Sequence, residues 1–331
     1  MIHGEEDPVR YKRLGRTGLK VSEICLGTMT FGGQADEETS RAIVQRALDA
    51  GVNFIDTANV YNAGRSEEIT GRIITGIRSR IVLATKVHGR MGEGPNDGGQ
   101  SRKHIMEAIE ASLRRLGTDY LDLYQVHRFD PETPLEETLR ALNDLVHAGK
   151  VRYIGCSNYA AWHLGKALWV SDRYGLARYD SLQPRYNLIS RAIDVEILPL
   201  CRDQEVGVIV YNPLAGGMLT GKHTRESEPA PGTRFAANRI YRDRYWRDVV
   251  FDAVDRLREI VRVTPYTMGQ VALAWVLARP GITSAILGAT SVQQLEETLP
   301  ATDIVLSPEL LEQLDELWQI VGRQEFPTPP W

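Results

Sequence analysis

Short apolar segments and longer amphipathic segments alternate along the chain eight times, and this alternation constrains the fold more than any other feature. The apolar runs have the length of buried strands, and each is followed by a stretch with helical periodicity. Such βα alternation is typical of a parallel sheet. The predicted strands span residues 24–28, 53–58, 81–87, 121–127, 151–157, 181–186, 207–212 and 282–287.

The predicted helices connect these strands and end the fold. They span residues 37–50, 66–74, 101–116, 134–149, 162–174, 195–205, 249–261 and 268–278, with one more starting at residue 291 and a last one over 308–321. A hairpin over residues 11–22 precedes the first strand, an irregular stretch over 213–247 follows the seventh, and a proline-rich tail ends the chain.

Eight βα units fill the 331 residues without a linker or a shift in composition. This count predicts a (β/α)8 TIM barrel and a single domain over residues 1–331. A doubly wound open sheet is the rival fold, and it calls for a glycine-rich GxGxxG turn after the first strand. Residues 27–33, Gly-Thr-Met-Thr-Phe-Gly-Gly, do not fit that pattern. The sequence therefore favours the barrel.

Composition narrows the class of protein. The net charge is −4 and no basic run stands out, so nucleic acid is not an expected partner. The acidic N-terminus is unlike a signal peptide, and no apolar run approaches the roughly 20 residues needed for membrane insertion. Cys25, Cys156 and Cys201 form no CxxC pair, and Cys25 and Cys156 lie inside apolar runs, as buried thiols do, which fits a reducing compartment. We expect a soluble cytoplasmic protein.

Four polar side chains stand at or just after the ends of predicted strands two, three and four. Asp56 and Lys86 lie at strand ends, His127 ends the next strand, and Tyr61 follows Asp56 by five residues. Taken singly, each has an ordinary explanation as a cap, a solvated lysine, a core histidine or a loop residue. Because the C-terminal strand ends of a barrel converge on one mouth, we expect the four to meet there.

These four groups suit the reduction of a carbonyl by a hydride donor. Negative charge develops on the substrate oxygen, so the site needs a proton donor. The ordinary pKa of tyrosine is near 10, and a neighbouring Lys86 ammonium would make Tyr61 a better acid. Asp56 would keep Lys86 charged, and His127 would donate a second hydrogen bond. No metal site is predicted, because the histidines are scattered along the chain.

The motifs around these residues resemble the aldo-keto reductase superfamily over almost the whole chain. The similar segments are residues 51–58 with Tyr61 and residues 66–68, Thr85-Lys86, and residues 116–127. The resemblance implies a barrel whose bottom is closed by the N-terminal hairpin. It also implies that Tyr61 is the general acid, that Lys86 and Asp56 tune it, and that His127 orients the carbonyl.

The resemblance further implies a nicotinamide cofactor, for which family habit favours NADPH and leaves NADH open. Ser157, Asn158 and Gln183 would bind its carboxamide, and Tyr211 would stack on its ring. The full set of expected cofactor contacts is Gly27, Thr28, Met29, Asp56, Ser157, Asn158, Gln183, Tyr211, Asn212, Pro213, Leu214, Gly216, Lys222, Arg234, Gly288, Thr290, Gln294, Glu297 and Thr298. Ser157-Asn158 could also simply cap the following helix.

Residues 213–222 are similar to the family's pyrophosphate loop and half-match a nucleotide-hydrolysing P-loop, but His223 stands where that motif needs Ser or Thr. At the adenosine end, Gln294 stands where several relatives carry arginine, and Thr298 stands where asparagine is usual. Arg234 resembles an arginine used near the ribose phosphate, or it is a solvated loop cation. These departures leave the choice between NADPH and NADH open.

The partner expected at the mouth is a small carbonyl substrate, an aldehyde or a ketone. Met29, Phe31, Trp162 and Tyr186 are candidates for an apolar wall, or else ordinary core and surface residues. The loop over 88–100 and the arginine-rich stretch over 224–247 either fold over the site or are solvated.

The branch that looks most similar contains potassium-channel β-subunits and glyceraldehyde phosphate and methylglyoxal reductases. A cofactor-sensing regulatory subunit is therefore the alternative to an enzyme. A barrel that has lost catalysis would lack one of the four residues, and all are present. A homo-oligomer is left open.

Overall fold

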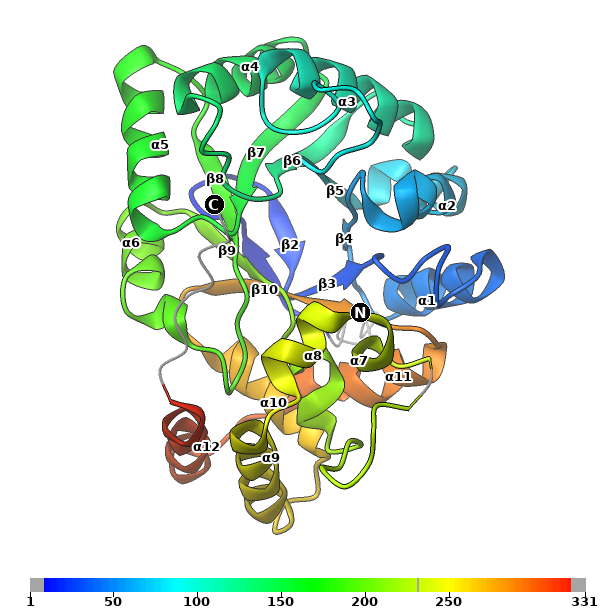
Figure 1. Cartoon of the computed structure of the whole chain (residues 1–331), viewed down its shortest axis with the longest axis vertical. Coiled ribbons are helices and arrows are strands. Elements are labelled where there is room, and N and C mark those ends of the chain that lie inside the picture. The colour runs from blue at the N-terminus through cyan, green and yellow to red at the C-terminus, as the bar shows by residue number, and fades with distance from the viewer. Residues whose placement is uncertain (1–8, 231, 323–331) are drawn as a thin grey trace, which may run out of the picture.

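Eight parallel strands close into a barrel, with helices around it (Figure 1). The computed structural model describes residues 9–230 and 232–322. The barrel strands are β3 (Ile24–Gly27), β4 (Phe54–Asp56), β5 (Val82–Val87), β6 (Leu121–Val126), β7 (Val151–Ser157), β8 (Tyr179–Gln183), β9 (Gly207–Val210) and β10 (Ile282–Gly288). Each strand pairs in parallel with the next, and β10 pairs with β3. The predicted TIM barrel is confirmed.

The helices lie outside the strand ring or near its mouth. They are α1 (Glu37–Asp49), α2 (Arg65–Ile74), α3 (Arg102–Leu116), α4 (Leu135–His147), α5 (Ala161–Tyr174), α6 (Ile197–Asp203), α7 (Arg234–Ala237), α8 (Arg239–Tyr245), α9 (Asp248–Val261), α10 (Met268–Ala278), α11 (Val292–Thr298) and α12 (Pro308–Val321). Short 3-10 turns are η1 (Tyr61–Gly64), η2 (Arg78–Arg80), η3 (Ala192–Asp194), η4 (Ala215–Thr220) and η5 (Leu299–Asp303). The acidic N-terminus and the proline-rich tail of the sequence lie outside the described residues.

The hairpin closes the N-terminal end of the barrel. It consists of β1 (Tyr11–Arg13) and β2 (Lys20–Ser22), which pair antiparallel. Leu14 and Val21 are fully buried in the apolar cluster that fills the barrel interior. Gly15 has φ of +56°, and a Cβ there would lie 2.5 Å from the carbonyl oxygen of Glu205. This close approach places the hairpin at the strand starts and leaves the other end open.

Several predicted boundaries differ by one or two residues, and two predicted elements differ more. The sixth strand, expected over 181–186, is β8 and ends at Gln183, because Pro184 has no N–H to continue the ladder. The stretch over 213–247, expected to be irregular, contains η4, α7 and α8. Caps explain the helices: Thr233 accepts from the Ala236 N–H at the start of α7, and Asn238 accepts from the Tyr241 N–H at the start of α8.

Among the described residues, no helix is both long and apolar enough to cross a membrane.

Candidate active site

The two-residue period of the strands points the polar side chains into the barrel mouth. Phe54 and Ala84 belong to the interior apolar cluster, as does Leu123. Side chains two residues further along each strand face the same way. That rule places Asp56 above Phe54 on β4 and Lys86 above Ala84 on β5. His127 follows Val126, the last residue of β6, and lies four residues beyond Leu123.

Lys86 joins the predicted residues physically. Its Nζ donates to Asp56 Oδ1, to the carbonyl oxygen of Thr57 at 2.8 Å and to the hydroxyl oxygen of Tyr61 at 3.2 Å. The Lys86 side chain is 0% exposed, so this ammonium depends on those three oxygens in place of water. The Tyr61 and His127 rings meet edge to face, with centroids 5.8 Å apart. The structure thus brings all four residues of the predicted tetrad together.

Tyr61 is held in place by the irregular turn that carries it. Asn62 and Ala63 have φ of 49° and 56°, in the left-handed region that favours glycine. The Asn62 side-chain amide donates to the carbonyl oxygens of Met29 at 3.1 Å and Phe31 at 2.7 Å. These bonds tie the Tyr61 turn to the loop after β3, so the strained turn is fixed from a neighbouring strand.

The protonation states follow from burial and charge. Burial by itself would lower the pKa of Lys86, but the Asp56 carboxylate and the Tyr61 hydroxyl raise it above its ordinary value, so the ammonium persists. Burial raises the pKa of Tyr61, and the nearby Lys86 charge offsets that rise only in part. Burial and the Lys86 charge hold the pKa of His127 well below its usual value. The site therefore contains a protonated phenol beside a neutral imidazole.

Asp56 is also bound by two amides. Its Oδ2 accepts from Gln125 Nε2 at 2.9 Å and from Gln183 Nε2 at 3.0 Å. The two amides bond to each other, with Gln183 Nε2 donating to Gln125 Oε1 at 3.2 Å. Gln125 was missed in the sequence, although it stands on β6 midway between Leu123 and His127. That inward register was the signal that could have identified it.

A second chain of hydrogen bonds links the predicted carboxamide-binding residues to the tetrad. Tyr211 donates from its hydroxyl to Asn158 Oδ1 at 2.9 Å, and Asn158 Nδ2 donates to the His127 carbonyl oxygen at 3.0 Å. Ser157 Oγ accepts from Asn158 Nδ2 at 3.0 Å and donates to the Gln183 carbonyl oxygen at 2.8 Å. Asn158 has φ of 56°. The ends of β6, β7, β8 and β9 thus share one network.

The loop after β9 exposes backbone and positive charge. Pro213 and Leu214 lead into η4, where Gly216 and Gly217 have φ of 71° and 103°. Lys222 is exposed and has no ion pair among the described residues. Its chain packs on Gly217, where an added Cβ would lie 3.2 Å from Lys222 Cε. The loop has the open backbone and the cation that an anion requires.

Arg234, on α7, reaches across the mouth to β10. One guanidinium nitrogen would lie 3.7 Å from a Cβ built on Gly288. Arg234 also lies over the ring of Tyr241, 5.1 Å from its centroid, and has no carboxylate partner among the described residues. Tyr241 donates to Asn212 Oδ1 at 3.0 Å, while the buried Asn212 Nδ2 has no partner in the described structure. This arrangement leaves a cation and an amide available for a ligand.

Of the expected adenosine-binding residues, Gln294, Glu297 and Thr298 lie on α11, and Thr290 lies just before it. Gln294 Oε1 accepts from the Thr290 N–H at 3.0 Å, and Thr298 Oγ1 donates to the Gln294 carbonyl oxygen at 3.0 Å. Glu297 Oε1 accepts from Gln293 Nε2 at 2.9 Å. These side chains therefore already have partners within their own helix or its cap, which a ligand would have to replace.

The end of β3 lies at the mouth between β4 and β10. Gly27 pairs with Asp56 and with Gly288, and a Cβ on Gly27 would lie 2.6 Å from Ile286 Cγ2. The Thr28 hydroxyl is buried and shares a 2.8 Å hydrogen bond with Ser66 Oγ. Met29 follows, half-buried, with its carbonyl oxygen bound to the Tyr61 turn.

The proposed apolar wall is only partly available. Phe31 and Tyr186 are fully buried, so they cannot offer a surface to a substrate. Tyr186 instead stacks on Trp275 of α10, with centroids 5.4 Å apart, and donates to Asp194. Trp162 is 60% exposed on α5, where it contacts Phe129 edge to face. Its role as a wall residue stays a prediction, as does that of Met29.

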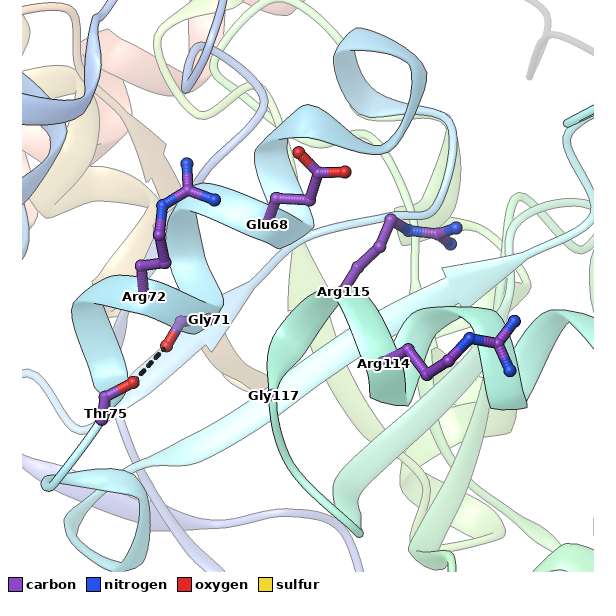
Figure 2. Close-up of a pocket in the computed structure, with 7 residues that line it drawn as sticks. All are labelled: Glu68, Gly71, Arg72, Thr75, Arg114, Arg115 and Gly117. Atoms are coloured by element: carbon purple, nitrogen blue, oxygen red, sulfur yellow. Dashed lines mark hydrogen bonds between the residues drawn. The ribbon is translucent and has the colours of Figure 1, made fainter.

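A separate hollow of about 420 Å³ lies outside the barrel wall (Figure 2). Figure 2 shows that α2 and α3 provide its lining, which consists of Glu68, Gly71, Arg72, Thr75, Arg114, Arg115 and Gly117. It includes no member of the tetrad. Within the described ranges, no cluster of three or more His, Cys, Asp or Glu side chains has the geometry of a metal site.

Comparison with known proteins gives the family. The model of the Aldo/keto reductase family matches residues 23–319. The chain is 41% identical over 337 aligned residues to the uncharacterized oxidoreductase YrpG of Bacillus subtilis, covering 98% of this chain and 100% of that protein. It is 40% identical over 321 residues to a probable voltage-gated potassium channel subunit beta of Arabidopsis thaliana, covering 94% and 97% of the two chains.

A further relative is the versiconal hemiacetal acetate reductase of Aspergillus parasiticus, 36% identical over 334 residues and covering 93% of this chain and 96% of that one. A (β/α)8 barrel with polar strand ends at one mouth is the architecture of many enzymes. The sequence match is what makes the assignment specific. This chain belongs to the aldo/keto reductase family, and that membership supports a carbonyl-reducing oxidoreductase.

Proposed function

We propose that this protein reduces small aldehydes or ketones to alcohols with NADPH, and that Tyr61 is the general acid. The observation that carries the proposal is the position of Lys86 Nζ, which bonds to both Asp56 and the Tyr61 hydroxyl oxygen. Since Lys86 donates to that oxygen, the phenol hydrogen is free to point into the mouth. A carbonyl oxygen held there would receive this proton as its negative charge develops.

In this proposal, His127 orients the carbonyl and Lys86 stabilises the phenolate. Neutral His127 can donate one N–H to the carbonyl oxygen, which fixes the substrate and stabilises developing charge. As the proton leaves Tyr61, the Lys86 ammonium stabilises the phenolate that forms. Asp56 keeps that ammonium charged in a buried place, and the amides of Gln125 and Gln183 hold Asp56 in position. Each residue thus has a role that its contacts support.

The residues present fit a nicotinamide dinucleotide. When bound, the reduced cofactor supplies the hydride that the protein itself lacks. Ser157, Asn158 and Tyr211 would hold the nicotinamide end beside His127. The pyrophosphate would meet the open loop at Gly216, the Asn212 Nδ2, which has no partner in the described structure, and the Lys222 ammonium, which forms no ion pair there.

At the adenosine end, Arg234 beside Gly288 has no carboxylate partner in the described structure, and it would meet a 2′-phosphate. This cation supports NADPH over NADH, since only NADPH carries that phosphate.

The three buried free cysteines suit the reducing cytoplasm, where we place the reaction.

The test is NADPH fluorescence and oxidation with purified protein, first alone and then with methylglyoxal, glyceraldehyde and 4-nitrobenzaldehyde. Tight binding with turnover is the expected result, and the relative rates would begin to rank substrates. A protein that binds neither NADPH nor NADH would overturn the proposal.

A cofactor-binding regulatory subunit is the second candidate, favoured by the 40% identity to a probable potassium channel subunit beta. It predicts tight NADPH binding with negligible turnover of all three carbonyls, and a stable complex with a membrane channel. Substantial turnover would favour the enzyme, because every member of the tetrad is present and in contact.

A further inference from the structure

Arg185 is a buried cation for which the described part of the chain provides no partner. Only 6% of the residue is exposed, and none of the ion pairs or side-chain hydrogen bonds among the described residues involves its guanidinium. A buried guanidinium normally requires an anion or several acceptors, because desolvation of the charge is costly. The other buried cation of the mouth, Lys86, has three oxygen partners. Arg185 therefore needs an explanation that the fold does not supply.

The backbone places Arg185 beside the candidate active site. It follows Gln183 by two residues, and Gln183 donates to Asp56. Arg185 forms a parallel bridge with Tyr211, and the flanking Tyr186 N–H donates to the Tyr211 carbonyl oxygen at 3.2 Å. Tyr211 in turn binds Asn158, which binds the His127 carbonyl oxygen. Arg185 is thus connected to the tetrad from two sides.

A second cation whose charge acts on Arg185 lies on α8. Arg244 has no carboxylate partner among the described residues, and its guanidinium lies 5.8 Å from the ring centroid of Tyr241 and 6.0 Å from that of Tyr245. Burial lowers the pKa of Arg185, the Arg244 charge lowers it further, and the Tyr245 and Tyr211 phenols lie near enough to oppose this. Two cations are therefore close together, and neither forms an ion pair with a carboxylate of the described residues.

We propose that Arg185 and Arg244 form an oxyanion subsite that holds a carboxylate or phosphate group of the carbonyl substrate. An oxyanion between the two guanidiniums would relieve their mutual repulsion and satisfy the buried Arg185. Charge-assisted bonds of this kind are strong and directional, and arginine suits planar or tetrahedral oxyanions. This inference rests on the proposed function, since it concerns the far end of a molecule whose carbonyl is reduced at Tyr61.

The substrate is a better candidate for this subsite than the cofactor. The phosphates of the dinucleotide have their own cations, Lys222 and Arg234, on the loop after β9 and on α7. Arg185 instead extends the inward-facing series on β8 that contains Gln183, the partner of Asp56. An anion bound there would lie beside the nicotinamide position at Tyr211, where a substrate must also lie.

The experiment compares pairs of related substrates in which only one member carries an oxyanion. The first pair is 4-carboxybenzaldehyde and its methyl ester, and the second is glyceraldehyde 3-phosphate and glyceraldehyde. We expect the wild-type protein to prefer the anionic member of at least one pair by about 10- to 100-fold in kcat/KM. Whether the carboxylate or the phosphate pair shows the larger ratio tells which oxyanion the subsite fits.

Arg185→Met is the principal variant, and Arg244→Met is the second. Each should lower the preference for the anion about tenfold or more, mainly through KM, while the Kd for NADPH stays within about twofold. Removing an unpaired buried charge should also raise the Tm of Arg185→Met, which shows that the variant folds. Arg242→Met is the matched control. Arg242 lies on α8, as Arg244 does, but it is exposed and pairs with Glu228.

A readout without turnover separates this inference from the proposed function. Calorimetric titration of the NADP⁺-saturated protein with benzoate and with inorganic phosphate should show binding of one anion, lost in Arg185→Met and kept in Arg242→Met. If the wild type reduces both members of each pair equally, or binds neither anion, the subsite is wrong while the reductase stands. If Arg185→Met weakens NADPH binding instead, the guanidinium serves the cofactor and the inference fails.

Discussion

Lys86 Nζ donates to the hydroxyl oxygen of Tyr61 across 3.2 Å, from a position where the ammonium is also bound by Asp56. The direction of this bond matters because it occupies a lone pair of the phenol and not its proton. Tyr61 can therefore donate its proton into the mouth, and Lys86 is in position to stabilise the phenolate that forms. This arrangement is the one that a proton donor needs, and several predictions depend on it.

Tyr61→Phe removes the proton donor and keeps the ring. We expect kcat to fall by about 100-fold or more, the usual size of a general-acid contribution, with the Kd for NADPH within about twofold. Steady-state kinetics measures kcat, and fluorescence titration measures the Kd for NADPH. Tyr174→Phe, on the exposed part of α5, is the control and should change neither. Near-normal turnover in Tyr61→Phe would assign the acid to another residue.

Lys86→Met leaves the buried Asp56 carboxylate without its cation. We expect turnover to be lost and the free energy of unfolding to fall by about 3–5 kcal/mol at pH 7, because a single buried charge is left unpaired. Urea denaturation measures the second effect. The double variant Lys86→Met/Asp56→Asn should recover much of the stability and none of the activity. A single variant as stable as wild type would contradict the pairing.

The rate should be insensitive to pH around neutrality. The pKa of His127 lies well below its usual value and that of Tyr61 lies above 10, so neither group titrates between about pH 6 and 8. The kcat/KM profile for an uncharged aldehyde should therefore be flat across that range. An inflection near pH 6.5 would show that His127 titrates as an ordinary, exposed imidazole does.

Arg234→Leu tests the choice of cofactor. Loss of the guanidinium beside Gly288 should weaken NADPH binding by about 10- to 100-fold and leave NADH binding nearly unchanged, since only NADPH has the 2′-phosphate. Fluorescence titration with each cofactor gives the two values. Arg239→Leu is the matched control, because Arg239 begins the next helix with its side chain 91% exposed. If the affinity for both cofactors falls equally, Arg234 binds the pyrophosphate and not the 2′-phosphate.

Asp180, which is not part of the tetrad, should make the free energy of unfolding depend on pH. Burial raises its pKa to about 6, despite the Arg16 guanidinium at 4.0 Å. The folded state holds the proton of this carboxyl group more tightly than the unfolded state does. The free energy of unfolding of the protein therefore falls as pH rises between about 4 and 6. Asp180→Asn should therefore raise the free energy of unfolding by about 1–2 kcal/mol at pH 7.5 and change it little at pH 4. Denaturation at the two pH values measures the difference.

The barrel could be predicted from the sequence because its signal is local and repeated. Each apolar run is buried on both faces, and each following segment has one apolar stripe, so strand and helix patterns are distinct. Prediction failed where long-range contacts decide the structure. Pro184 ended β8 early, and caps at Thr233 and Asn238 made helices of a stretch whose composition suggests a loop.

The tetrad could be predicted from the register of its strands, but its bonds could not. That Asp56, Lys86 and His127 share one mouth follows from their position at consecutive strand ends. That Gln125 and Gln183 both bind Asp56 depends on how neighbouring strands are staggered, and the sequence contains no local sign of this stagger. Phe31 and Tyr186 look like wall residues in the sequence and are core residues in the structure.

The sequence by itself determined the eight-fold βα order and the polar residues at the strand ends, because hydrophobic periodicity and residue chemistry act locally. Only the tertiary structure decided which cations are paired with an anion of the protein. Lys86 and Arg185 are both buried, and Lys86 has a carboxylate partner while Arg185 has none among the described residues. The physical reason is that the electrostatic state of a charge depends on groups distant in sequence, which barrel closure alone brings within bonding distance.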